Sequence, residues 1–209
     1  MKKKNGRAVL LLCVSVLIVC VFCDVLRLSD ASTLSVYNGT VRLRVIADSD
    51  DPSDQAVKYA VRDALIREAG SRFTRCRTVT EAVDEINASM PFLQMTAERT
   101  VRKMGADCGV KVRLLEEAFP VRTYGHFTFP AGTYLSLHVE LGSASGRNWF
   151  CVMYPPLCLN AACDSAEEGR RLFASCGFSQ REIAALENGS EKREVKLAAV
   201  ELMRDLFLR

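Results

Sequence analysis

The chain has 209 residues, with 28 lysines and arginines, 25 aspartates and glutamates, 2 histidines and 49% hydrophobic residues, a composition typical of a globular protein. The formal net charge of +3 is misleading, because four basic residues precede any acidic one. Beyond residue 23 the 28 basic residues fall to 24 against 25 acidic ones, a net charge of −1. This balance argues against a protein that binds nucleic acid through its phosphates.

The N-terminus predicts an export segment. A basic stretch over residues 1–7 precedes 16 uncharged, mostly apolar residues, 8–23. This length lies between a signal-peptide core and a short membrane span, and cleavage after Ala31 would release the rest. By the positive-inside rule, either outcome places residues 32–209 outside the cytoplasm. We therefore expect a signal peptide or signal anchor over residues 1–31 and a single exported domain over residues 32–209.

The first half of that domain predicts one strand and two helices. Residues 41–47 alternate apolar and charged side chains, as a half-buried strand does. Asp51 is placed to cap a helix over residues 52–70, whose apolar residues recur at three- and four-residue steps. A second helix is expected over residues 80–104, and Pro91 must kink or divide it.

The second half predicts strands followed by helices. Alternating residues indicate a strand over 110–114, and two further strands over 133–141 and 148–154 are joined by a turn-rich segment, 142–147, as in a hairpin. Three helices are expected to begin near Ser165, Ser179 and Ser190. The predicted fold is therefore α+β, with a mostly antiparallel sheet packed against helices.

Nine cysteines divide into three in the apolar leader and six beyond it, which permits up to three disulfides in an exported domain. Their spacings are not those of a zinc site. Cys151 and Cys158 flank the turn-forming sequence Tyr154-Pro155-Pro156 and are the candidate disulfide pair. For the other four cysteines, we favour free thiols buried in the core.

Two reactive arrangements are weighed and disfavoured. A hairpin closing at residues 144 and 145 would place His138 opposite Cys151, near enough for a thiolate–imidazole pair, but no third group orients the histidine. Four aspartates between Asp48 and Asp54 lack the loop glycine and distal glutamate of an EF-hand, and helix capping explains part of the run. We therefore expect no enzyme, metal site or cofactor.

Interleaved aromatic and basic residues are the more informative signal. Tyrosine, tryptophan and arginine are the residue types that anchor protein interfaces. The alternative for each is a core aromatic or a solvated arginine. The candidate partner-contact residues are Arg42, Arg44, Arg122, Tyr124, Arg147 and Trp149.

Four ordered blocks of sequence stand out: VRLRVIADSD…DQAVKYAVRDA, FPVRTYG, PAGTY and GRNWFCVMYPPLC. Together they resemble the stage II sporulation protein R family of endospore-forming bacteria, over essentially the whole exported domain. The resemblance implies a protein made in the forespore and exported into the space between the two cells. There it would trigger a membrane-embedded aspartic peptidase of the mother cell, which removes the pro-sequence of sigma E.

Two other functions stay open at this point. One is an exported hydrolase that uses Cys151 and His138, acting on cell wall. The other is a membrane-anchored scaffold protein. In the favoured hypothesis the chain is a ligand that acts by binding, its partners are the peptidase and, through the N-terminal segment, the membrane, and it binds no nucleic acid.

Overall fold

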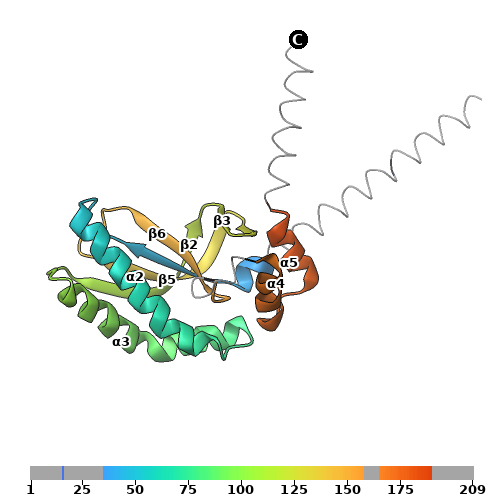
Figure 1. The fold of residues 1–209 in the computed structure, drawn as a ribbon, viewed down its shortest axis with the longest axis horizontal. Coiled ribbons are helices and arrows are strands. Elements are labelled where there is room, and N and C mark those ends of the chain that lie inside the picture. The colour runs from blue at the N-terminus through green and yellow to red at the C-terminus, as the bar shows by residue number, and fades with distance from the viewer. Residues whose placement is uncertain (1–15, 17–34, 158–164, 190–209) are drawn as a thin grey trace, which may run out of the picture.

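The computed structural model describes Val16, residues 35–157 and residues 165–189 (Figure 1). Apart from Val16, the predicted export segment lies outside the described residues, as does the helix expected near Ser190. Among the described residues, no helix has the length and hydropathy needed to cross a membrane.

The centre of the fold is a mixed four-stranded sheet with the strand order β2-β5-β1-β6. The strands are β1 (Val41–Ile46), β2 (Val110–Phe119), β5 (Gly132–Leu141) and β6 (Asn148–Tyr154). β1 runs parallel to β5 and antiparallel to β6, while β2 and β5 are antiparallel. The α+β class is confirmed, but the sheet is mixed because its central pair is parallel.

The hairpin predicted from β5 to β6 is wrong, because β1 lies between these two strands. Leu43 and Val45 of β1 are fully buried, so this strand takes a central position with neighbours on both sides. Two inter-strand spacings, about 10 Å, then separate β5 from β6, a span that a six-residue loop covers. The loop is fastened to the end of β1, where the Ser143 backbone N–H donates to the Asp48 carboxylate and the Gly146 N–H to the Ala47 carbonyl.

Helices α2 (Pro52–Phe73) and α3 (Val79–Lys103) pack side by side against one face of the sheet (Figure 1). Their buried residues, such as Leu65 and Ile86, join the same core as Leu43 of β1. Asp51 is the N-cap residue of α2 and Pro52 its first residue, as predicted, although the Asp51 side chain makes no capping hydrogen bond. Pro91 lies inside α3, which continues through it and is not divided.

A short hairpin that the sequence pattern does not predict lies on the other side of the sheet. It consists of β3 (Arg122–Tyr124) and β4 (Phe127–Phe129), and Gly125 adopts a positive φ of 56° in the turn between them. Two helices, α4 (Ala166–Ser175) and α5 (Gln180–Glu187), lie at one end of the molecule (Figure 1). Their N-caps are confirmed as Ser165 and Ser179, the latter in a capping box with Glu182.

Candidate functional site

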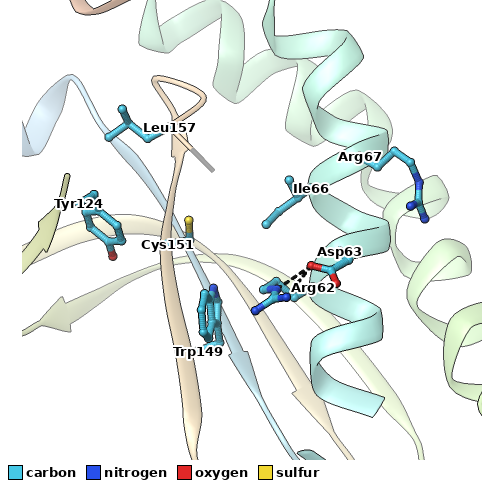
Figure 2. Close-up of a pocket in the computed structure, with 8 residues that line it drawn as sticks. All are labelled: Arg62, Asp63, Ile66, Arg67, Tyr124, Trp149, Cys151 and Leu157. Atoms are coloured by element: carbon cyan, nitrogen blue, oxygen red, sulfur yellow. Dashed lines mark hydrogen bonds and ion pairs between the residues drawn. The ribbon is translucent and has the colours of Figure 1, made fainter. Parts of the chain in front are cut away.

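Two adjoining pockets lie along β6. The first, which we call the basic–aromatic pocket, has a volume of about 510 Å³ and is lined by Gln55, Lys58, Tyr59, Arg122, Tyr124, Arg147, Asn148, Trp149 and Phe150. The second, which we call the helix-side pocket, has a volume of about 600 Å³ and is lined by Arg62, Asp63, Ile66, Arg67, Tyr124, Trp149, Cys151 and Leu157 (Figure 2). The pockets adjoin because both include Tyr124 and Trp149.

Four of the six predicted contact residues meet in the basic–aromatic pocket. Arg122 and Tyr124 come from β3, Arg147 from the loop before β6, and Trp149 from β6 itself. Because β3 packs over the sheet on the side away from the helices, residues 122–124 lie next to a strand that comes some 25 positions later in the chain. The Tyr124 hydroxyl fixes this approach by donating to the carbonyl of Phe150 at 3.2 Å.

Arg42 does not line either pocket, because its side chain is fully buried beneath them. Its guanidinium lies over four aromatic rings at 4.6–5.5 Å, and its Nη2 donates to the Tyr124 hydroxyl at 3.2 Å. Its Nε and Nη1 have no hydrogen-bond partner among the described residues. Burial lowers the pKa of Arg42, and the positive charge of Arg122 lowers it further. Arg42 therefore supports Tyr124 from within the core.

Arg44 belongs to a polar network across the sheet and not to either pocket. Its Nη1 pairs with Glu117 at 2.6 Å, and Glu117 in turn accepts from His138 at 3.1 Å. Burial raises the pKa of the Glu117 carboxyl, but the donors around it, Arg44 and His138 among them, outweigh burial and hold that pKa below its ordinary value. His138 also contacts Glu140, which pairs with Arg113. The charged groups of these residues pair with one another inside the network, and the Arg44 side chain is half-buried.

The sequence analysis did not predict that α2 contributes to the site, although seven of its residues line the two pockets: Gln55, Lys58, Tyr59, Arg62, Asp63, Ile66 and Arg67. Lys58 and Tyr59 line the basic–aromatic pocket, and Arg62 stacks over Trp149 at 4.3 Å in the helix-side pocket. Tyr59 meets Trp149 edge to face, with ring centroids 5.7 Å apart. Figure 2 shows Arg62 between Trp149 and the helix. The sequence feature that could have revealed these α2 residues is the mixture of basic and aromatic residues in the block QAVKYAVRDA.

The cysteine–histidine pair, which the sequence already disfavours, is not formed. In the sheet, His138 lies opposite Arg44 and Arg113, whereas Cys151 lies opposite Leu43, because β1 separates their strands. Cys151 is also disulfide-bonded, so it has no thiol. The other described cysteines, Cys76, Cys108 and Cys176, are free. The partner of Cys151 and the candidate Cys158 lie outside the described residues, so that pairing stays a prediction.

The aspartates after β1 bind neighbouring protein groups. Asp48 accepts from Ser143, Asp54 from the Ser49 hydroxyl, and Asp50 from Arg147. The backbone and hydroxyl donors of Ser143 hold the pKa of Asp48 below its ordinary value. Across the described ranges, no group of three or more histidine, cysteine or acidic side chains is arranged to hold a metal ion. These contacts fasten the loop that carries Arg147 to the end of β1.

Comparison with known proteins gives the chain its family. The family model of stage II sporulation protein R matches residues 37–164, which include β1 to β6 and every residue of both pockets. The chain is also 30% identical, over 193 residues, to the stage II sporulation protein R of Bacillus subtilis (strain 168), and the match covers 86% of each chain. No solved structure matches the chain. The chain belongs to the stage II sporulation protein R family.

Proposed function

We propose that this protein is an exported signal that activates a membrane-embedded aspartic peptidase by binding it, which leads to removal of the pro-sequence of sigma E. Membership of the family supports a role in stage II of sporulation. The binding mechanism is supported by one observation above the others: two adjoining pockets that expose aromatic and basic side chains along β6.

Activation by binding requires a difference in affinity. A ligand shifts the equilibrium between an inactive and an active peptidase only if it binds the active form more tightly. Aromatic rings and arginines provide such energy when they become buried in an interface. The basic–aromatic pocket concentrates both kinds of side chain in one concave surface, which makes it the proposed contact surface.

The test is reconstitution in a host that does not sporulate. The full chain is co-expressed there with the peptidase and pro-sigma E, and processing is followed by immunoblot. We expect processed sigma E only when both the chain and the peptidase are present, with the peptidase bearing a substituted catalytic aspartate as the negative control. Equal processing with and without the chain would contradict the proposal.

A further inference from the structure

We propose that the basic–aromatic pocket binds an acidic segment of the peptidase, that is, an extended stretch of its chain with aspartate or glutamate side chains. This inference rests on the proposed function, because it takes the peptidase as the partner. It adds the chemistry by which the partner is recognised.

The lining of the basic–aromatic pocket carries positive charge only. Lys58, Arg122 and Arg147 line the pocket, and none of its lining residues is acidic. The chain beyond residue 23 carries a net charge of −1, so this excess of positive charge is local and not a property of the whole surface. A cleft lined with one sign of charge attracts a ligand of the other sign.

Lys58 is buried, and among the residues that the structure describes no carboxylate pairs with it. The residue is 1% exposed, and its ammonium donates to two neutral oxygens, the Gln55 amide at 2.6 Å and the Arg147 carbonyl at 3.2 Å, and lies 4.4 Å from the centre of the Tyr59 ring. A buried cation is stable when it is paired, because burial removes it from water. A carboxylate bound in the pocket would supply the missing charge.

The charges of Arg122 and Arg147 also favour an acidic ligand. In the part of the chain that the structure describes, neither Lys58 nor Arg122 forms an ion pair. Arg122 lies over the Phe150 ring at 5.2 Å, and its charge acts unfavourably on buried Arg42. Arg147 reaches Asp50 at 3.3 Å, but both side chains are exposed, so water and salt weaken that pair.

The shape of the surface favours a segment of chain over a small anion. The basic–aromatic pocket continues at Tyr124 and Trp149 into the helix-side pocket, where Ile66 and Leu157 provide an apolar wall. A segment with acidic side chains followed by an apolar one would fill both pockets. An inorganic anion would leave the aromatic rings and the apolar wall uncovered.

The test is site-specific photo-cross-linking of the full chain, co-expressed with the peptidase. A benzophenone amino acid replaces Tyr59, which is 40% exposed at the pocket, or, as the control, Met104, which is 46% exposed just after α3. We expect a cross-link to the peptidase from position 59 only. Mass spectrometry should place it within a peptidase segment rich in aspartate and glutamate. A cross-linked segment without carboxylates would overturn the inference.

Charge reversal provides the second readout. Arg122→Gln should lower sigma-E processing about tenfold, the loss expected for one charged contact. Arg122→Glu should abolish processing, and exchanging an acidic residue of the cross-linked segment for arginine should restore it. Processing by Arg122→Gln at the wild-type level would overturn the acidic-segment inference and leave the proposed function standing. Failure of the wild-type chain to stimulate processing would instead contradict the proposed function itself.

Discussion

Arg42 is a buried cation whose neighbours are aromatic rings and not carboxylates. Its guanidinium lies near Phe119, Tyr124, Phe129 and Tyr134, and only one of its nitrogens donates a hydrogen bond, to the Tyr124 hydroxyl. Cation–π contacts of this kind contribute about 0.5–2 kcal/mol each when they are shielded from water. The residue thus holds the sheet and β3 together and keeps Tyr124 at the pocket.

Truncating this side chain tests that role. Arg42→Ala should lower the free energy of unfolding by about 3 kcal/mol, because it removes the cation–π contacts and leaves a cavity among the rings. Arg42→Met fills most of the same volume and should cost less than the alanine variant. Urea denaturation followed by circular dichroism measures both variants. An Arg42→Ala variant with the wild-type free energy of unfolding would show that the cation does not stabilise the four surrounding aromatic rings.

Cys151 gives a second prediction at the residue scale. The structure shows it disulfide-bonded, and the sequence predicts Cys158 as its partner across the Tyr154-Pro155-Pro156 turn. Peptide mapping of the exported protein without reduction should therefore recover a peptide that joins Cys151 to Cys158. A peptide that joins Cys151 to Cys163 would contradict the predicted pairing.

At the scale of elements, the loop between β5 and β6 positions Arg147. This loop crosses the end of β1 and is tied to Asp48 by the Ser143 backbone and hydroxyl and by the Ser145 hydroxyl. Gly146 approaches the segment that follows β1 so closely that a Cβ atom there would overlap the carbonyl group of Ser49. The loop can therefore keep its place only with glycine at that position.

Gly146→Ala should consequently displace the loop and lower the free energy of unfolding by about 2 kcal/mol, the usual cost of forcing a methyl group into packed structure. It should also reduce sigma-E processing, because Arg147 follows directly. Gly109→Ala is the matched control, since a Cβ at Gly109 meets no atom within 4 Å. Chemical denaturation and the processing assay compare the two, and equal behaviour of both variants would refute the role of the loop.

The elements also show what the sequence can reveal. Hydrophobic periodicity and capping residues predicted β1, β5, β6, α2 and α3 closely, and for α4 and α5 the residue at which each helix begins, because those signals are local. Strand order was predicted wrongly, because β1 enters between β5 and β6 from more than 80 residues away. The β3–β4 hairpin was missed because its strands have three residues each, too short for a periodic pattern.

The sequence predicted only part of the site, because residue type is a local signal and the packing of distant segments is not. Arg122, Tyr124, Arg147 and Trp149 were singled out by residue type, and tertiary folding brings them into one pocket. Residue type could not reveal that Arg42 is buried, since its alternation with Leu43 predicts an outward-facing side chain. It is the β3–β4 hairpin, packed over that face, that removes Arg42 from solvent.

At the scale of the whole molecule, buried and hydrogen-bonded carboxylates set the pH dependence of stability. Glu117 has a lowered pKa in the folded protein, because its donors outweigh the effect of burial. The unfolded chain then binds more protons than the folded one in acid. The Glu117 carboxylate therefore stabilises the folded protein fully above the pKa of a glutamate in the unfolded chain, about 4.3. This stabilisation is lost as the pH falls through the lower pKa that Glu117 has in the folded protein.

The expected outcome is a free energy of unfolding that declines below about pH 4.3, and Glu117→Gln should flatten part of that decline because it removes the titrating group. Urea midpoints of both proteins at pH 7, 5, 4 and 3 measure the effect. The variant should be less stable than wild type at pH 7 and should approach it at pH 3. Parallel curves would exclude Glu117 as a source of acid sensitivity.

The basic–aromatic pocket is the surface through which we propose that this family member signals. Its most direct test is pro-sigma-E processing by the full-length Arg122→Ala/Arg147→Ala variant, compared with Arg99→Ala/Arg102→Ala, which removes the same charge from exposed positions of α3. With both variants at wild-type abundance, the account predicts that processing falls at least about tenfold in the pocket variant only. Wild-type processing by the pocket variant would contradict it.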